Sequence, residues 1–411
     1  MARLKFFALI FGMAVGILFM ASQAAQAQTF AIVHKFNGFP NDGRMPTAPV
    51  ILDAQGNIYG TAYAAGKFGG GVVFKKPANG YDTVLHNFTS GSNAAGRNGA
   101  NPAGLVRDAA GNLYGTTMSG GNLSCPLSTA GCGTVFKLDP SNRLTVLHRF
   151  DYTDGALPNA GLLLDAAGNL YGTTGLGGQA NNGTVFKIDT STGHLTVLKS
   201  FPNQFGVPAG AIAMDAAGNI YGTYGLGGDS DCECGGVFEL TTNHSPTFFT
   251  DLLDFTGSNG ATPYGGVVID ADDNLYGMTS AGGNNSCAAG KGCGVIFELP
   301  LYARETVLYT FSGLADGSTP QASVILDADG NLYGTTAFGG NTTTAGGGHG
   351  VVFKLDTSRN ETVLHTFNGT DGAQPMANLT MDSTGNLYGT TVYGGSTACT
   401  NGCGVVFKVA P

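Results

Sequence analysis

The sequence Gly-Asn-Leu-Tyr-Gly, or a close variant, occurs seven times at nearly even spacing. The seven asparagines are Asn57, Asn112, Asn169, Asn219, Asn274, Asn331 and Asn386, separated by 55, 57, 50, 55, 57 and 55 residues. A nearly constant period of this length indicates a repeat architecture, in which one supersecondary unit is copied and packed against its neighbours. We therefore expect recurring residues to serve the fold, and we seek functional residues among those that break the pattern.

Each repeat predicts four β-strands. In the third repeat, four segments rich in Val, Leu, Thr, Tyr and Phe (158–165, 169–174, 183–188 and 195–201) are separated by turn residues. The first turn, Asp-Ala-Ala-Gly-Asn, has glycine where a tight hairpin needs a left-handed residue. The segments are apolar on both faces, as in sheets covered on both sides. Antiparallel four-stranded units of this size are typical of propeller blades.

The two ends of the chain favour a closed ring over an open solenoid. Segment 30–36 matches the fourth segment of a repeat, and segment 404–409 matches the third. The last repeat thus lacks a fourth strand while the N-terminus carries a spare one, which in a ring would remove two open edges. We predict an all-β fold, a seven-bladed β-propeller of four-stranded antiparallel blades, closed by the N-terminal strand completing the last blade.

The N-terminus predicts export. Arg3 and Lys5 precede the apolar run 6–20, and Ala25-Gln26-Ala27 offers a cleavage site. Residues 1–27 are therefore predicted to be a signal peptide, with an uncleaved anchor as the alternative, and residues 28–411 a single domain. The mature chain would carry 17 basic and 28 acidic residues, a net charge of −11, and no membrane span. We expect a secreted or periplasmic monomer that does not bind nucleic acid.

The eight cysteines fall into four close pairs between the second and third segments of their repeats. The pairs are Cys125 with Cys132, Cys232 with Cys234, Cys287 with Cys293, and Cys399 with Cys403. In an exported protein such pairs predict local disulfides, although Cys232 and Cys234 would close a much smaller ring. A zinc site is the alternative, but its ligands would be scattered over different repeats.

One acidic segment could bind a cation. Asp229, Asp231 and Glu233 alternate along a loop and could supply oxygen ligands to Ca²⁺. The spacing of a complete calcium loop is missing, so a solvated acidic loop is the alternative. No other cofactor is predicted.

One position of the first segment varies while its neighbours stay small. Six residues before each repeated aspartate stand Thr47, Pro102, Asn159, Ala209, Tyr264, Gln321 and Met376. Variable polar and aromatic groups around a shared opening suit a ligand site, although an unconstrained loop would vary in the same way. We select Thr47, Asn159, Tyr264, Gln321 and Met376 as candidate binding residues, with the Tyr264 ring as the anchor.

Arg107 is a further candidate. It precedes the repeated aspartate at a position where the other six repeats carry Leu, Ile or Met. Its guanidinium would either face the central channel or reach solvent at the end of the strand.

Two longer patterns suggest relatives. Asp-x-x-Gly-Asn-Leu-Tyr-Gly-Thr-Thr, followed by Gly-Gly, Gly-Thr-Val-Phe-Lys-Leu and Thr-Val-Leu-His-x-Phe, resembles the GloVer-type "choice-of-anchor" bacterial extracellular tandem-repeat family across residues 30–409. The Asp-x-x-Gly-Asn-x-Tyr hairpin is similar, less closely, to NHL-type and lactonase-type propellers. The first resemblance implies export and a variable C-terminal anchor, which does not follow the last repeat of this sequence. It implies no established activity.

These features favour binding over catalysis. We predict a binding or scaffold module for a glycan, peptide or surface protein. A propeller-type enzyme, such as a lactonase, glycosidase or lyase, is the alternative. An enzyme would need carboxylates, Asn or His pointing into the central channel, whereas the innermost strands carry small and apolar residues. The seven repeated aspartates are expected to cap hairpins, so no catalytic residue is predicted. The loops joining successive repeats vary in length, so we place the ligand on their face of the ring.

Overall fold

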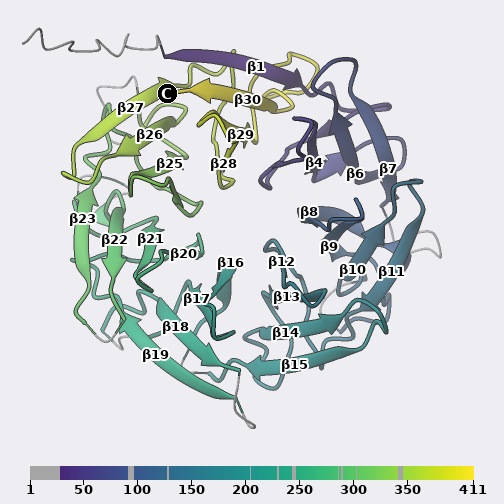
Figure 1. Ribbon diagram of the computed structural model, residues 1–411, viewed down its shortest axis with the longest axis horizontal. Coiled ribbons are helices and arrows are strands. Elements are labelled where there is room, and N and C mark those ends of the chain that lie inside the picture. The colour runs from purple at the N-terminus through teal and green to yellow at the C-terminus, as the bar shows by residue number, and fades with distance from the viewer. Residues whose placement is uncertain are drawn as a thin grey trace, which may run out of the picture.

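Figure 1 shows a ring of sheets arranged radially around a central axis, the architecture of a β-propeller. The computed structural model describes residues 28–411 except 91–96, 127–128, 204, 229–230, 243–246, 286, 288–289, 302 and 341–345. The predicted signal peptide lies outside the described residues. Within them there is no α-helix, and hence no long apolar helix of the kind that crosses a bilayer.

Seven antiparallel sheets form the blades, and the strands of each blade follow one another from the axis outwards. Blade 1 contains β3 (Ile51–Leu52), β4 (Ile58–Ala62), β6 (Gly69–Lys76) and β7 (Thr83–Thr89); the short strand β5 (Ala64–Ala65) pairs with β6, and β2 (Gly43–Arg44) pairs with β5. Blade 2 contains β8 (Ala100–Arg107), β9 (Leu113–Ser119), β10 (Thr134–Leu138) and β11 (Leu144–Arg149). Blade 3 contains β12 (Leu163–Leu164), β13 (Asn169–Thr174), β14 (Thr184–Asp189) and β15 (Leu195–Ser200).

The remaining blades have the same order. Blade 4 contains β16 (Pro208–Met214), β17 (Ile220–Tyr224), β18 (Gly236–Thr241) and β19 (Phe248–Asp254). Blade 5 contains β20 (Val267–Ile269), β21 (Leu275–Thr279), β22 (Val295–Leu299) and β23 (Thr306–Thr310). Blade 6 contains β24 (Ile325–Leu326), β25 (Leu332–Thr336), β26 (Val351–Leu355) and β27 (Glu361–Thr366). Blade 7 contains β28 (Thr380–Met381), β29 (Leu387–Thr391), β30 (Val405–Ala410) and β1 (Thr29–Lys35).

In blades 1, 3, 5, 6 and 7 the innermost strand is shorter than the sequence predicts, whereas β8 and β16 have eight and seven residues. The pattern predicts one strand over 158–165, yet only β12 is paired in the ladder. Pro158 has no N–H to donate, and Leu157 before it has a φ of 54°. Carbonyls in this part of the innermost strand are instead bound from the preceding blade. Thr223 of β17, for example, donates to the Gly265 carbonyl at 2.8 Å.

The blades are joined by a phenylalanine pair at every seam. A phenylalanine at or directly after the end of the outermost strand of one blade packs edge-to-face on one in the third strand of the next, with ring centroids 5.1 to 5.4 Å apart. The pairs are Phe36–Phe74, Phe88–Phe136, Phe150–Phe186, Phe201–Phe238, Phe255–Phe297, Phe311–Phe353 and Phe367–Phe407. A Cβ at Gly172 would lie 2.7 Å from the Phe186 ring, which explains the second glycine of the repeated motif.

The repeated aspartate caps the first hairpin of each blade, as its periodicity predicted. Asp165 accepts hydrogen bonds from the Asn169 N–H and Nδ2, both at 2.7 Å, and from the Tyr171 hydroxyl at 3.1 Å. The other six repeats form the same three bonds. Partial burial opposes the effect, but these hydrogen bonds hold the pKa of Asp165 below its usual value.

The two ends of the chain meet in blade 7. β1 pairs antiparallel with β30, in a register that runs from Thr29 opposite Ala410 to Lys35 opposite Val405. Phe36, directly after β1, is fully buried and forms its aromatic pair with Phe74 of blade 1. How far this pairing holds the ring closed stays a prediction, which deletion of β1 would test.

Candidate functional site at the mouth of the ring

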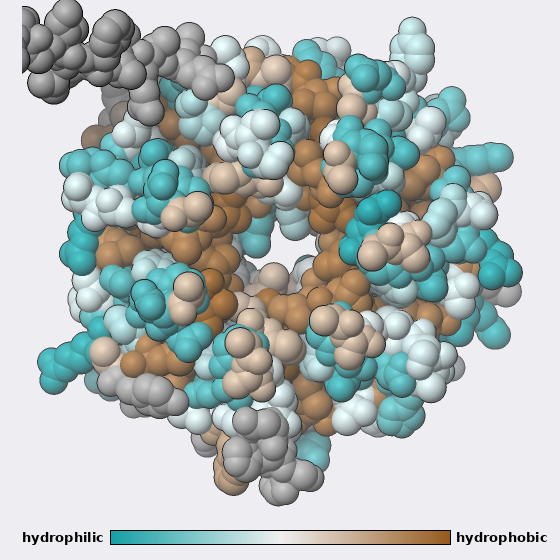
Figure 2. All heavy atoms as spheres, in the orientation of Figure 1, coloured by the Kyte–Doolittle hydropathy of each residue, from teal (hydrophilic) through white to brown (hydrophobic). Residues whose placement is uncertain are grey.

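Antiparallel connections give the ring two different faces. The hairpin turns between the first and second strands, and between the third and fourth strands, lie on one face, which we call the turn face. The loops that join successive blades, and those between the second and third strands, lie on the other face, which we call the loop face. Figure 2 shows that the ring is open at its centre, with brown and pale residues bordering most of the opening.

A cavity of about 370 Å³ occupies the axis of the ring. Its lining includes Thr47, Asn159, Tyr264, Gln321 and Met376, so the structure brings together five of the six predicted binding residues from five different blades. We call this cavity the mouth. The binding of a ligand by these side chains stays a prediction.

The lining also includes residues that were not selected as candidates, among them Tyr63, Met118 and Asn378. Asn378 stands where the other repeats carry Pro, Gly, Ala or Ser, so its amide was a detectable departure from the repeat. It accepts a hydrogen bond from the Ser323 N–H at 2.8 Å. Tyr63 directly follows β4 and Met118 lies near the end of β9, at a position where the other repeats have smaller residues, which is a second such signal.

The mouth is uncharged. None of its lining residues, all of which belong to the described part of the chain, is Asp, Glu, Lys, Arg or His. Its polar side chains are amides and hydroxyls, and these groups both donate and accept hydrogen bonds. The mouth therefore offers hydrogen bonds and aromatic surface without a formal charge.

One backbone arrangement presents all five predicted side chains. The residue two positions before each has a φ of 54° to 57°, its N–H donates to the loop of the preceding blade, and its carbonyl accepts from the end of the second strand. These residues and the loop carbonyls are Met45 with Cys403, Leu157 with Cys132, Thr262 with Cys234, Thr319 with Cys293, and Gln374 with His349. A repeated and rigid backbone thus carries side chains that differ from blade to blade.

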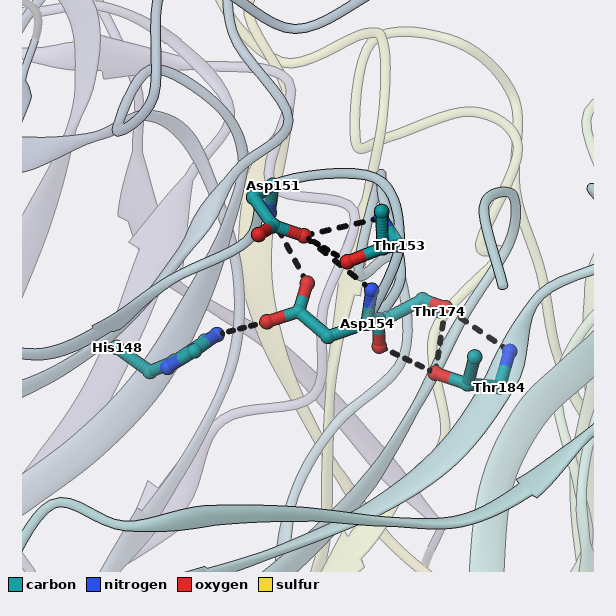
Figure 3. Close-up of polar contacts among 6 residues, drawn as sticks. All are labelled: His148, Asp151, Thr153, Asp154, Thr174 and Thr184. Carbon is teal, nitrogen blue, oxygen red and sulfur yellow. Dashed lines mark hydrogen bonds and ion pairs between the residues drawn. The ribbon is translucent and has the colours of Figure 1, made fainter. Parts of the chain in front are cut away.

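Figure 3 shows how the loop before Asn159 is held. His148 Nε2 lies 2.7 Å from the Asp154 carboxylate, and the second carboxylate oxygen accepts from the Asp151 N–H at 3.0 Å. The Asp154 carbonyl accepts from the Thr184 hydroxyl at 3.1 Å, and Thr184 contacts Thr174 at 3.0 Å. This network joins blade 2 to the inner strands of blade 3 and fixes the approach to the mouth.

Tyr264 is held by its backbone while its side chain stays accessible. The Thr262 carbonyl accepts from both the N–H and the hydroxyl of Ser280, at 3.1 and 2.7 Å. The Tyr264 ring lies beside Gly225, where a Cβ would be 3.5 Å from the ring. The residue is nevertheless 49% exposed, so the ring can contact a ligand.

A second cavity of about 770 Å³ lies between blades 4 and 5 on the loop face. We call it the groove. Its lining includes the Cys232–Cys234 disulfide, Leu226, Lys291 and Tyr264. Because Tyr264 lines both cavities, the groove adjoins the mouth at this ring. The sequence predicted neither the groove nor this junction.

The family model of the Gloeobacter/Verrucomicrobia repeat matches residues 14–162, 124–340 and 287–411. The chain belongs to this repeat family. This agrees with the GloVer-type resemblance carried by the repeated motifs. A search of curated protein sequences gives no significant match.

Solved structures show the same fold as this Gloeobacter/Verrucomicrobia repeat protein at low sequence identity. Virginiamycin B lyase from Staphylococcus aureus has a TM-score of 0.61 at 11% identity, covering 93% of this chain and 99% of the lyase. Oligogalacturonate lyase from Vibrio parahaemolyticus has a TM-score of 0.56 at 10% identity, covering 94% of each chain. The extracellular domain of a protein described as a hybrid two-component system, from B. thetaiotaomicron, has a TM-score of 0.57 at 14% identity. That match covers 93% of this chain and 41% of the other. At these identities the likeness shows the fold alone.

The repeat protein contains four disulfides, each within one loop. They join Cys125 to Cys132, Cys232 to Cys234, Cys287 to Cys293, and Cys399 to Cys403, and no cysteine is free. These are the local pairs expected from the sequence, and they leave no thiolates for the alternative zinc site. Four of the carbonyls that fix the backbone of the mouth belong to these cysteines.

The acidic segment lies only partly within the described residues, so the calcium site stays a prediction. Asp229 lies outside the described residues, whereas Asp231 and Glu233 lie within them. No group of three Asp, Glu, His or Cys residues suited to a metal ion occurs among the described residues. Glu233 lines the groove.

Arg107 lies apart from the other candidates. Its guanidinium carbon is 5.7 Å from the centre of the Tyr59 ring, beside Gly111 of the hairpin turn. It therefore sits at the turn-face end of its strand and does not line the mouth. The sequence left two placements open for the guanidinium, the central channel or the end of the strand, and in the structure it lies at the end of the strand.

The outer seams of this repeat protein hold titratable groups that the sequence did not connect. His365 Nε2 lies 3.1 Å from the Asp371 carboxylate, and His148 Nε2 lies 2.7 Å from that of Asp154. Two glutamates at the start of outermost strands face other seams, and burial raises the pKa of both Glu305 and Glu361 to about 7. Each has one buried carboxylate oxygen without a hydrogen-bond partner.

Proposed function

We propose that this protein is an exported binding module that holds an uncharged ligand at the mouth. The observation that carries the proposal is the convergence of five non-repeating side chains, from five blades, on one cavity whose lining is uncharged. Their backbone is fixed by the same hydrogen bonds in each of these blades. Variable side chains on a rigid scaffold are the usual construction of a binding site.

The chemistry of the mouth favours binding over catalysis. General acid–base and nucleophilic catalysis need groups that exchange protons or attack near neutral pH, most often carboxylates, imidazoles or thiols. The lining of the mouth supplies amides, hydroxyls, two tyrosines and two methionines. An enzyme of the lactonase, glycosidase or lyase type is therefore the second candidate, and two of the structures with this fold bear the name of lyases.

Several features support a location outside the cytoplasm. Residues 1–27 have the composition of a signal peptide. Disulfides form and persist in oxidising compartments, and this chain has four. We infer a secreted or periplasmic monomer in which residues 28–411 form one domain. A glycan, peptide or surface protein is the expected class of partner, and the acidic balance disfavours nucleic acid.

The test begins with a ligand screen on residues 28–411. Glycan-array binding and thermal shift with small molecules should identify an uncharged ligand. Tyr264→Ala and Gln321→Ala should then each weaken it about tenfold or more while leaving the melting temperature nearly unchanged. Tyr81→Ala is the matched control, because Tyr81 is 92% exposed and lies on the turn face. Normal binding by both mouth variants, together with loss of binding on changing the hairpin turns, would overturn the proposal.

A further inference from the structure

Tyr264 joins two cavities that would otherwise be separate sites. It lines the mouth of about 370 Å³ and also the groove of about 770 Å³ between blades 4 and 5. We propose that the ligand is a neutral oligosaccharide chain that runs from the mouth, across the Tyr264 ring, into the groove. This inference rests on the proposed binding function and names its ligand class.

The two volumes favour a chain over a single small molecule. A site for one small ligand typically measures about 300–1,000 Å³, so each cavity alone can hold one compact unit. Two such cavities in series, divided by a half-exposed aromatic ring, form an elongated site with successive positions. A linear polymer occupies successive positions with equivalent units.

The polar groups match hydroxyls. In the mouth, Asn159, Gln321 and Asn378 carry amides, each of which can donate and accept. In the groove, the hydroxyls of Ser258 and Thr319 do the same, whereas the Thr256 hydroxyl donates to Asn259 at 3.0 Å and keeps only its acceptor capacity. Sugar hydroxyls are both donors and acceptors, so they can pair with such groups in either sense. The Tyr264 ring offers an apolar face for the C–H surface of a sugar and a hydroxyl at its edge.

The charges disfavour an ionic ligand. An acidic sugar or a charged peptide would carry its charge into a mouth whose lining has none of opposite sign, and an unpaired charge away from water is costly. The groove carries one acidic and one basic side chain, Glu233 and Lys291, whose formal charges cancel. Neither cavity therefore selects for net charge.

The strand geometry disfavours an extended peptide. Peptides that bind along a sheet usually add a strand to a free edge and take up its backbone hydrogen bonds. The edges nearest the axis are the innermost strands, and in blades 1, 3, 5, 6 and 7 these have only two or three residues. These five strands offer little backbone for strand addition, whereas β8 and β16 of blades 2 and 4 have eight and seven residues.

The first experiment measures affinity against chain length by isothermal titration calorimetry. The probes are linear gluco-, manno- and xylo-oligosaccharides of two to eight units, with oligogalacturonates and an unrelated extended peptide for comparison. At least one neutral series should bind, and its affinity should rise about tenfold or more between the dimer and the hexamer. Preference for the acidic series or the peptide, or no neutral binding at millimolar concentrations, would overturn the inference.

Variants then test which part of the oligosaccharide each cavity binds. Leu226 is 52% exposed at the groove, so Leu226→Trp should fill the groove without disturbing the core. It should abolish the gain from added units while leaving dimer affinity unchanged. Gln321→Ala should weaken every length, and Tyr264→Phe should keep most of the affinity that Tyr264→Ala loses.

The outcomes separate this inference from the proposed function. If affinity does not rise with length but still depends on Gln321 and Tyr264, the chain ligand is wrong and the mouth remains a binding site. If neutral oligosaccharides bind independently of Gln321, Tyr264 and Leu226, both proposals fail.

Discussion

The turn face repeats the same hydrogen bonds between the same side chains seven times, whereas the loop face repeats its backbone path and changes its side chains. Tyr171 and Tyr264 illustrate the difference. Tyr171 is only 8% exposed, and its hydroxyl donates to Asp165 of the same hairpin. Tyr264 is 49% exposed and borders two cavities. In this ring, side-chain contacts on the turn face stabilise the blades, and backbone contacts on the loop face leave the side chains free to bind.

The largest expected effect on stability concerns β1, the fourth strand of blade 7. Deleting residues 28–36 removes β1, exposes the edge of β30 and removes the fully buried Phe36 from the seam with blade 1. We expect loss of cooperative folding or aggregation, measured by circular dichroism melts and size-exclusion chromatography. A truncated protein that stays monomeric with an unchanged melting temperature would contradict closure by the N-terminal strand.

A smaller effect on stability would distinguish the role of the turn face from that of the loop face. Asp165→Ala removes one acceptor from three donors and should lower the free energy of unfolding by about 2–3 kcal/mol. Ligand binding at the mouth should stay unchanged, because the hairpin lies on the opposite face. Chemical denaturation and titration calorimetry on the same variant measure both quantities.

Gln321→Ala is the reciprocal variant. It should lower the free energy of unfolding by less than about 0.5 kcal/mol while weakening binding. If Asp165→Ala impaired binding as strongly as stability, the separation of the two faces would be wrong.

The sequence predicted the repeated parts of the molecule better than the rest. The seven blades, the aspartate caps and the local cysteine pairs all follow from patterns that recur in register. Recurrence reveals such contacts because each lies within one repeat, between residues at fixed spacing. The predicted length of the innermost strand was wrong in blades 1, 3, 5, 6 and 7. In blade 5, for example, the Gly265 carbonyl accepts from Thr223 of another blade, a contact that no spacing within one repeat reveals.

The candidate site was predicted only in part for the same physical reason. In a ring, equivalent positions near the axis of each repeat lie close together. Thr47, Asn159 and the other predicted mouth residues could therefore be assigned to one site from the sequence. The groove is formed by two loops and a blade connection that meet at one seam, and no spacing along the chain encodes that meeting. Arg107 breaks the pattern as clearly as Tyr264 does, yet it lies at the other end of its strand.

The outer seams give a pH-dependent prediction of moderate size. Burial raises the pKa of Glu305 and Glu361 to about 7, above the usual value of about 4.3 in an unfolded chain. Folding then disfavours the ionised form, so stability is lost as the pH rises from about 4 to about 7. Allowing for solvent screening, Glu305→Gln and Glu361→Gln should each stabilise the protein by about 1 kcal/mol at pH 8.

The same variants should differ little from the parent protein at pH 4, where most of these carboxyls are protonated in both states. Thermal melts across this range measure the effect, and mouth ligands should bind both variants normally. A gain in stability that is equal at pH 4 and pH 8 would show that packing, and not ionisation, is responsible.

The smallest effect is expected at Arg107, a departure from the repeat that the structure places on the turn face. Its exposed guanidinium over Tyr59 contributes about 0.5–1 kcal/mol at most, and a leucine, which three other repeats carry there, would recover part of that by packing. Arg107→Leu should therefore change the free energy of unfolding by less than about 0.5 kcal/mol and leave binding at the mouth unaltered. A clear loss of ligand affinity would show that the turn face takes part in binding after all. An unchanged affinity would mean that breaking the repeat marks a functional residue only where the backbone carries that residue to the mouth.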